Sequence, residues 1–148
     1  MDTLTIGEKF KSKYDFRETC FGIVSMNKQI LLVKKNNQYS LIGGGIEKGE
    51  TFEQCLKREF LEETGLIITD IKPLVCVDCF WLAAGKYPME SKANIFEVDV
   101  DLKNKTSPLE EGNEIEWVEI SSAVDLLPLP YHKEALNFYL KQNNIVLN

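Results

Sequence analysis

Three glutamates, Glu59, Glu62 and Glu63, stand close together at the end of a segment that the sequence predicts to be helical. A carboxylate at a helix C-terminus meets the negative end of the helix dipole, which costs about 0.3–1 kcal/mol. Like charges three or four residues apart on a helix cost about 0.2–0.5 kcal/mol more. We therefore expect a positive group beside them, and oxygen ligands at this spacing suit a hard cation such as Mg²⁺ or Mn²⁺.

The predicted helix begins after Thr51, which can form a capping box with Gln54, and ends before Gly65. At 100° per residue, one line of this helix carries Phe52, Leu56, Glu59 and Glu63, with Cys55 and Glu62 beside it. This face starts apolar and ends in carboxylates, so the acids are predicted to continue the buried face to its edge. The alternative is an ordinary solvated charge run that pairs with Lys57 and Arg58.

Three consecutive glycines at 43–45 precede this helix and follow a short strand predicted at 39–42. Because glycine has no side chain, the backbone here can approach a ligand closely or turn its carbonyl groups toward one. Gly44 and Gly49 have the spacing of a phosphate-binding P-loop, but Glu50 stands where that loop needs a lysine. The sequence therefore excludes a P-loop.

The whole chain has the composition of a globular protein with an acidic excess. We expect its 148 residues to form one domain; 44% are hydrophobic, and 23 acidic against 17 basic residues give a net charge of −6. This charge argues against a protein that grips a nucleic-acid polymer, which needs a basic surface. Without a targeting segment or a long apolar run, we expect a cytoplasmic monomer or homodimer with no membrane partner.

Cys76 and Cys79 form a C-x-x-C pair, which raises the alternative of zinc or redox chemistry. A structural zinc site takes about four ligands, yet the chain has no second such pair and His132 is its only histidine. The surrounding VCVDCFW is rich in strand-forming residues, so we interpret the pair as free thiols on a partly buried strand.

The rest of the chain mixes predicted strands and helices. Strands are expected at 21–26, 29–35, 39–42, 74–81, 93–100 and 114–120. Besides the helix before Gly65, helices are expected at 123–127 and 132–142. Asn27-Lys28 and Asn36-Asn37 are predicted to be tight turns, and Ser121 or Ser122 to cap the helix at 123–127. This order predicts a sheet covered by helices.

The glycines and the helix together resemble the signature of the Nudix hydrolases, G-x5-E-x7-R-E-U-x-E-E-x-G-U, where U is a bulky apolar residue. The pattern is met here by Gly44, Glu50, Arg58, Glu59, Phe60, Glu62, Glu63, Gly65 and Leu66. Phe60 is aromatic where an aliphatic residue is commoner, and Ile42 stands where the family often has proline. The signature spans residues 44–66 of the 148.

The resemblance implies a fold of the α/β (α+β) class, an α/β/α sandwich around a central mixed sheet in which 44–66 form a loop–helix–loop. It implies a Mg²⁺-dependent hydrolase, with Mn²⁺ as a substitute, that cleaves a nucleoside diphosphate linked to another moiety by attack of water on phosphorus. The expected partner is a small nucleotide: a nucleoside triphosphate, oxidised or not, or a nucleotide sugar.

The resemblance also implies roles for the acidic residues. Glu62 and Glu63 would ligate the cation together with the carbonyl of Gly43. Glu59 would bind a further metal or help to activate water. Glu59, Glu62 and Glu63 are therefore the expected catalytic residues.

Residues around this core complete the expected site. Glu50 and Arg58 would form an ion pair that holds the loop against the helix. A carboxylate after the signature completes the metal shell in some members. Glu111 is the candidate here, with Glu114 and Glu116 as rivals and a solvated strand edge as the alternative for all three.

Four residues are candidates for binding substrate. Lys34 and Lys35, at the end of a strand expected near the glycines, could contact phosphate, against the alternative of an exposed strand end. Phe80 and Trp81 could stack on a base, although such residues more often serve in packing.

Two other functions remain open. A Nudix-fold module could bind a nucleotide without turning it over, but the complete set of Glu59, Glu62 and Glu63 favours an enzyme. Isomerase chemistry on isoprenoid diphosphates would need additional cysteine and glutamate catalysts that the sequence does not place.

Overall fold

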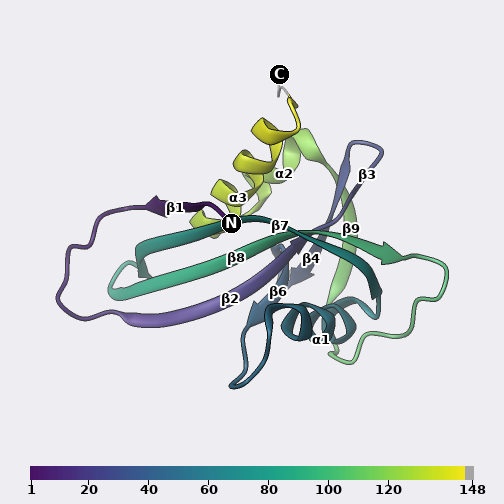
Figure 1. The fold of residues 1–148 in the computed structure, drawn as a ribbon, viewed down its shortest axis with the longest axis horizontal. Coiled ribbons are helices and arrows are strands. Elements are labelled where there is room, and N and C mark those ends of the chain that lie inside the picture. The colour runs from purple at the N-terminus through teal and green to yellow at the C-terminus, as the bar shows by residue number, and fades with distance from the viewer. Residues whose placement is uncertain (146–148) are drawn as a thin grey trace.

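The computed structural model describes residues 1–145, which contain nine strands and three helices (Figure 1). The strands are β1 (Thr3–Ile6), β2 (Asp15–Ile23), β3 (Ser25–Met26), β4 (Gln29–Lys35), β5 (Gln38–Ser40), β6 (Ile42–Gly45), β7 (Ile67–Ala83), β8 (Tyr87–Asp101) and β9 (Glu114–Glu119). The helices are α1 (Phe52–Thr64), α2 (Ile120–Leu126) and α3 (Pro130–Gln142). Within residues 1–145, no helix is long and apolar enough to cross a membrane.

The strands form two sheets. The first has five strands in the order β1-β7-β8-β2-β6, and it is mixed because β1 runs parallel to β7 and β8 runs parallel to β2. In the second sheet, β4 pairs antiparallel with β3, β5 and β9. The mixed sheet was expected, whereas the second, antiparallel sheet was not predicted.

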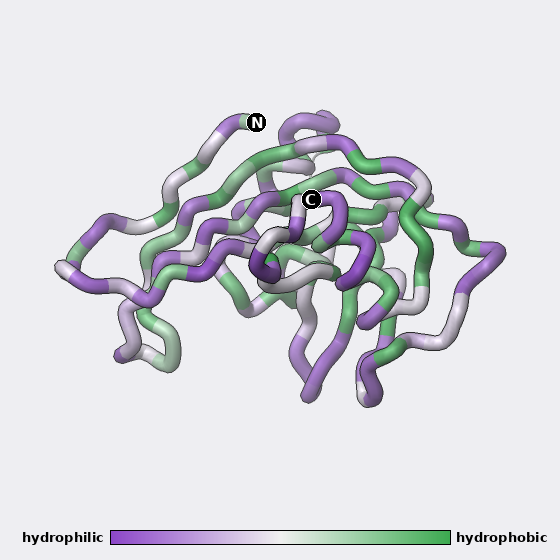
Figure 2. Tube along the Cα trace, turned by 60° about the horizontal axis from the view of Figure 1, so that its bottom comes forward, coloured by the Kyte–Doolittle hydropathy of each residue, from purple (hydrophilic) through white to green (hydrophobic). Residues whose placement is uncertain are grey.

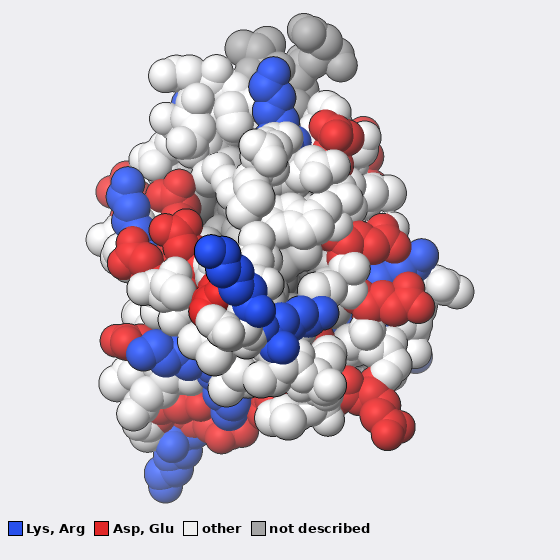
Figure 3. Space-filling view, turned by 90° about the vertical axis from the view of Figure 1, so that its right-hand side faces the viewer, with Lys and Arg blue, Asp and Glu red and all other residues white. Residues whose placement is uncertain are grey.

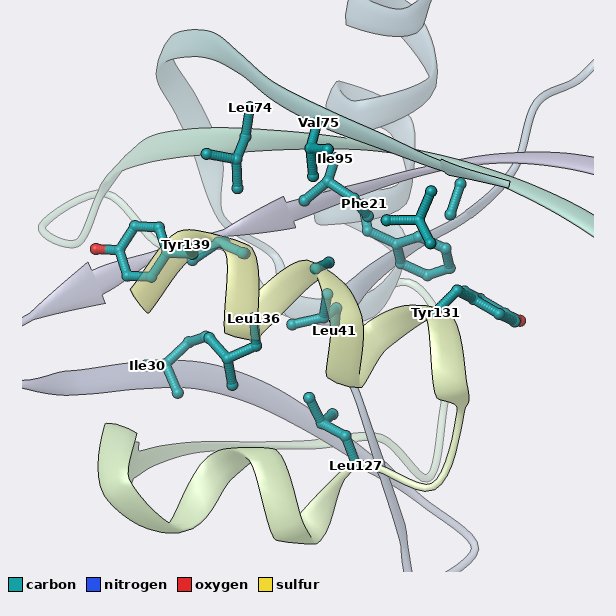
Figure 4. Packing of buried hydrophobic residues seen from close by; sticks show 14 of the residues in the cluster. Phe21, Ile30, Leu41, Leu74, Val75, Ile95, Leu127, Tyr131, Leu136 and Tyr139 are labelled. Atoms are coloured by element: carbon teal, nitrogen blue, oxygen red, sulfur yellow. The ribbon is translucent and has the colours of Figure 1, made fainter. Parts of the chain in front are cut away.

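Helices cover both sides of the sheets, with α1 on one side and α2 and α3 on the other (Figure 1). Side chains alternate along β4, so that Leu31 and Val33 pack on the α1 side while Ile30 and Leu32 pack on the α3 side. Figure 4 shows the second of these cores, in which residues of α3 lie against strand residues such as Ile30 and Ile95. The predicted α/β/α sandwich with a central mixed sheet is confirmed.

Hydropathy follows this layering. In Figure 2 the centres of the long strands are largely hydrophobic, and most of the turns and connecting loops at the periphery are hydrophilic. Both predicted two-residue turns are present: Asn27 and Lys28 have φ of 51° and 62°, and Asn36 and Asn37 have φ of 49° and 61°. Two consecutive left-handed residues match the twist of a hairpin, which is why asparagine is favoured there.

The long strands extend beyond their predicted ends. β2 begins at Asp15 instead of residue 21, and β7 and β8 each continue past both predicted limits. The added residues mix polar and apolar side chains and many are exposed, so no long apolar run marks them; cross-strand pairing over 67–101 holds them extended.

The short strand predicted at 39–42 is divided. Residues 38–40 form β5 in the antiparallel sheet, and β6 begins at Ile42 in the mixed sheet. The predicted caps of α2 were wrong, because Ser121 and Ser122 lie within the helix, whose N-cap is Glu119 without a side-chain hydrogen bond. The last helix begins at Pro130, where proline fits because a first-turn residue needs no backbone N–H.

The ends of α1 lie where the sequence predicted them. Thr51 and Gln54 form a complete capping box, and Gly65 adopts the left-handed conformation with φ of 72°. The Gly65 N–H donates to the carbonyls of Phe60 and Leu61, both at 3.1 Å. Phe52 departs from the predicted buried line, since it is 39% exposed, although its ring lies 5.7 Å from that of Phe96.

Replacement of Gly65 by alanine tests how α1 is terminated. A left-handed backbone costs an alanine about 1–2 kcal/mol, and the added Cβ would also collide with the carbonyl oxygen of Thr106. Gly49→Ala is the matched control, because Gly49 has φ of 82° but no atom within 4 Å of the Cβ position. We expect urea unfolding to show a loss for Gly65→Ala exceeding that for Gly49→Ala by about 1–3 kcal/mol; equal losses would contradict this role of Gly65.

Candidate active site

The acidic end of α1 is buried, as the sequence predicted. Glu59 is 9% exposed and Glu63 only 1%. On the opposite face of the helix, Glu53, Gln54 and Lys57 are exposed. The carboxylates therefore continue the apolar face of α1 into the interior instead of forming a solvated stripe.

The family resemblance implied a loop from residue 44 onward. In the structure, however, all three glycines belong to strand β6. Gly43 and Gly44 pair with Phe21 and Cys20 of β2. A Cβ on Gly44 would lie 2.6 Å from the Glu59 carboxylate, and one on Gly43 would collide with the Cys20 carbonyl. The missing side chains let the end of α1 approach this strand, which is a packing requirement and not only an access route for ligands.

A guanidinium connects the two halves of the signature. Arg58 donates from Nε and Nη2 to the carboxylate of Glu50 at 2.6 and 2.9 Å, and from Nη2 to the Gly45 carbonyl at 3.0 Å. Its Nη1 also lies 2.9 Å from Glu59 Oε1 and 3.3 Å from Glu62 Oε2. The hydrogen bonds from Arg58 hold the pKa of Glu50 at about 2, well below its usual range. The expected pair between Glu50 and Arg58 is thus present in the geometry.

A second cation, Lys35, reaches the buried carboxylate. Its Nζ donates to Glu63 Oε1 at 2.5 Å and lies 4.0 Å from Glu110 Oε2. The other oxygen of Glu63 accepts from the Gly43 N–H at 2.9 Å. Burial raises the pKa of Glu63 to about 7 even though Lys35 and the Gly43 N–H favour its charged form. The pKa of Lys35 is raised, because the hydrogen bond and charge of Glu63 together outweigh its own burial.

The two candidate lysines face opposite sides of β4. Lys34 lies over the ring of Tyr39, with its Nζ 5.3 Å from the ring centroid. Alternation along the strand places Lys34 with Leu32 on the α3 side and Lys35 with Val33 on the α1 side. Only Lys35 joins the carboxylates.

Glu59, Glu62 and Glu110 each offer one carboxylate oxygen, and these oxygens all lie within 4.8 Å of one another. Glu110 was missed by sequence reasoning, which selected Glu111. The backbone N–H of Glu110 donates to the Glu62 carbonyl at 2.9 Å and so brings residue 110 to the end of α1. Glu111 is exposed and lies outside this group, so the structure places Glu110, and not the predicted Glu111, beside Glu59 and Glu62.

The rivals of Glu111 also lie elsewhere. Glu116 accepts a hydrogen bond from the Tyr39 hydroxyl at 2.6 Å, and Glu114 is opposite Lys34 in the pairing of β9 with β4. Both therefore lie on the side of the sheet that faces away from Lys35. In the sequence, the one feature that indicates Glu110 as a site residue is its position shortly after the signature. Glu111 shares that feature, so the sequence does not distinguish the two.

The donor set fits a hard divalent cation. Glu59, Glu62, Glu63 and Glu110 supply only carboxylate oxygens, the ligands that Mg²⁺ and Mn²⁺ prefer. Burial raises the pKa of Glu59, although Arg58 opposes the shift. A carboxylate whose charge is disfavoured by burial gains most from a cation beside it.

The candidate base-stacking residues do not share one site. Phe80 stacks edge-on against Tyr14 at 5.3 Å, whereas Trp81 donates from Nε1 to Ser91 Oγ at 2.9 Å and contacts Tyr131. Successive strand residues point to opposite faces, so at most one of the pair can line any single pocket.

The same alternation separates the two cysteines of the C-x-x-C pair, which are three residues apart on β7. Cys79 lies in the core beneath α3, and both thiols are buried and free. The interpretation of this pair as strand cysteines agrees with their burial.

Replacement of Glu50 by glutamine removes the charged partner of Arg58. Because hydrogen bonds to charged groups contribute about 1.5–3 kcal/mol, we expect a loss of this order in the free energy of unfolding at pH 7. The pKa of Glu50 is lowered from 4.5 to about 2, so the stability from this pair is present above pH 4.5 and is lost as the pH falls toward 2.

The difference between Glu50→Gln and the parent, measured by urea unfolding from pH 7 to pH 3, should therefore shrink below pH 4.5. Glu53→Gln is the control, since Glu53 pairs with Lys57 on the exposed face at 2.7 Å and its loss should cost no more than about 0.5 kcal/mol. A Glu50→Gln difference that is independent of pH would contradict the ion pair.

Comparison with known proteins agrees with the fold and the signature. The sequence model of the NUDIX domain matches residues 16–142. The chain is 47% identical over 53 residues to the NAD-capped RNA hydrolase NudC of Vibrio cholerae, covering 33% of this chain and 20% of that protein. It is 45% identical over 51 residues to the ADP-ribose pyrophosphatase of Methanocaldococcus jannaschii, covering 31% of this chain and 30% of that protein.

These matches cover less than a third of the curated relatives' own lengths. In three dimensions, the MutT NUDIX hydrolase from Burkholderia pseudomallei is similar with a TM-score of 0.65 at 22% identity, over 83% of this chain and 97% of that one. Since the NUDIX domain match extends over most of its length, the chain belongs to the Nudix hydrolase family.

Proposed function

We propose that this chain is a Mg²⁺-dependent pyrophosphohydrolase that cleaves a nucleoside diphosphate linked to another moiety, with Mn²⁺ as a substitute metal. The observation that carries the proposal is the group formed by Glu59, Glu62 and Glu110, whose oxygens lie within 4.8 Å of one another beside buried Glu63. A diphosphate would be repelled by bare carboxylates, so this arrangement favours catalysis only with a cation between them.

Within this proposal, Glu59, Glu62, Glu63 and Glu110 would hold the cation, with the Gly43 carbonyl as a further ligand. When bound, a divalent cation counters the negative charge of the diphosphate and lowers the pKa of bound water. A carboxylate oxygen of Glu59, Glu62 or Glu63 that the cation leaves free would take the proton of the attacking water as general base. Water would add to phosphorus as the bridging P–O bond breaks, and the electron pair of that bond would leave with the departing phosphate.

The proposed role of Glu50 and Arg58 is to position these groups. Arg58 contacts Glu50 and the Gly45 carbonyl on one side and Glu59 and Glu62 on the other. A guanidinium with several donors in a fixed plane suits this bridging position. The pair would therefore hold the carboxylates in register with β6.

The proposed substrate class is a small nucleotide, such as a nucleoside triphosphate, oxidised or not, or a nucleotide sugar. The relatives named NAD-capped RNA hydrolase and ADP-ribose pyrophosphatase act, by their names, on compounds that contain a nucleoside diphosphate. On the face seen in Figure 3, acidic and basic side chains are interleaved, without the broad basic surface that a nucleic-acid polymer favours. Together with the net charge of −6, this face favours a small nucleotide over a polymer as the substrate.

Replacement of Glu63 by glutamine tests the proposed catalysis. We expect hydrolysis of the best substrate from a panel (nucleoside triphosphates, oxidised nucleotides, nucleotide sugars, ADP-ribose and NAD-capped RNA) to fall at least about 100-fold, the scale of a lost acid–base or charge-stabilising group. Glu53→Gln, on the exposed face of the same helix, should retain the parent rate. If no panel member is hydrolysed by the parent, or the folded Glu63→Gln variant remains fully active, the chain is instead a binding module or uses other residues.

The adjacent glutamates after the signature provide a matched pair for the metal site. Glu110→Gln should weaken Mn²⁺ binding about 10-fold or more, as measured by the loss of the free Mn²⁺ paramagnetic resonance signal, because it removes a ligand oxygen. Glu111→Gln makes the same charge change one residue away and should bind Mn²⁺ as the parent does. If Glu111→Gln weakens Mn²⁺ binding and Glu110→Gln does not, Glu111 is the ligand and the assignment of Glu110 is wrong.

A further inference from the structure

Lys35 places a positive charge beside the carboxylate group, by which we mean the side chains of Glu59, Glu62, Glu63 and Glu110. Its ammonium lies 2.5 Å from Glu63 and 4.0 Å from Glu110. The lysine side chain is 38% exposed and that of Glu63 only 2%, so the ammonium reaches inward from a partly exposed strand end to a buried acid.

The contact with Lys35 supplies a counter-charge to the buried carboxylate of Glu63. Arg58 already contacts Glu50, Glu59 and Glu62, and Glu63 lies in a different part of the group. Lys35 is the cation paired with Glu63 among residues 1–145, and Glu63 has no other charged partner there. Burying a carboxylate without a counter-charge is strongly unfavourable, so Lys35 stabilises the folded chain when no metal is bound.

The same ammonium opposes a divalent cation. A metal held by Glu63 and Glu110 would compete with Lys35, whose Nζ contacts Glu63 Oε1 and lies 4.0 Å from Glu110 Oε2. Two positive charges a few ångströms apart repel each other strongly in a partly buried site. A lysine side chain is long and flexible enough to leave such a contact for solvent. The Lys35 side chain can therefore leave its ion pair with Glu63 and move into solvent.

We propose that Lys35 serves as the counter-ion of the carboxylate group when no metal is bound. A divalent cation that binds there displaces Lys35 from Glu63 and Glu110. Lys35 thereby lowers the metal affinity of the site and determines the metal concentration at which the site fills. This inference rests on the proposed metal-dependent function. It assigns to Lys35 a role toward the metal, in place of the phosphate contact expected from its position alone.

The experiment compares Mg²⁺ binding by four chains at pH 8.5: the parent, Lys35→Met, Lys35→Arg and Lys34→Met. At this pH a carboxyl group and a lysine in their ordinary pKa ranges are both charged, so the comparison concerns the ion pair between Lys35 and Glu63. Isothermal titration calorimetry with Mg²⁺ alone gives the affinity, and thermal unfolding with and without Mg²⁺ gives the stabilisation by metal.

We expect Lys35→Met to bind Mg²⁺ about fivefold or more tightly than the parent, because the competing charge is gone. Without metal it should unfold at a lower temperature than the parent, and the rise in unfolding temperature on adding Mg²⁺ should be larger. Lys35→Arg keeps the charge and should bind within about twofold of the parent. Lys34→Met makes the same change in net charge on the opposite face of β4, where Lys34 lies over Tyr39, and should also match the parent.

Other results would overturn the inference. Unchanged or weaker Mg²⁺ binding by Lys35→Met would mean that Lys35 is neutral toward the metal or positions its ligands, while the proposed function would stand if the parent still binds Mg²⁺. Equal tightening in Lys34→Met would reduce the effect to overall charge. If neither the parent nor Lys35→Met binds Mg²⁺, the proposed metal-dependent function fails and the inference fails with it. Lys35→Gln repeats the comparison if methionine impairs folding.

Discussion

The close packing of α1 against strand β6 is the contact on which the candidate site depends. Each of the three consecutive glycines meets a different residue of the helix. Gly43 donates its N–H to Glu63, the missing side chain of Gly44 leaves room for Glu59, and the carbonyl of Gly45 accepts from Arg58. The glycines thus bring the acidic end of α1 against a sheet edge and bury carboxylates that would otherwise be solvated.

Burial of these acids explains why the chain carries two cations in the same place. Arg58 lies within 3.8 Å of four glutamates, namely Glu47, Glu50, Glu59 and Glu62. Lys35 contacts Glu63 and lies near Glu110. The negative charge that the sequence leaves at the end of α1 is therefore partly offset by the chain itself. Arg58 is bound on both sides and suits a permanent structural role, whereas Lys35 makes few contacts and can be displaced.

Local signals predicted much of this arrangement. The capping box at Thr51, the left-handed Gly65 and the 3.6-residue period of α1 all act within a few residues, and they located the helix and the buried side of Glu59 and Glu63 correctly. The hairpin turns were predictable for the same reason, since asparagine tolerates the left-handed conformation. Fold class and family followed from the signature within this pattern.

Features that depend on distant pairing were not predictable. That the glycines form a strand depends on their register with β2, and the separate antiparallel sheet depends on β9 reaching β4. Glu110 and Glu111 are adjacent and chemically identical, so only the backbone hydrogen bond from Glu110 to Glu62 distinguishes them. Likewise, alternation indicates that Lys34 and Lys35 face opposite sides, but only the assembled layers show which side holds the carboxylates.

The most direct measurement is a crystal structure of the chain grown with Mn²⁺ and recorded at a wavelength where manganese scatters anomalously. We expect an anomalous peak among the carboxylates of Glu59, Glu62, Glu63 and Glu110. A peak at another site, or none among these glutamates at a saturating Mn²⁺ concentration, would contradict the assignment of this group as the metal site.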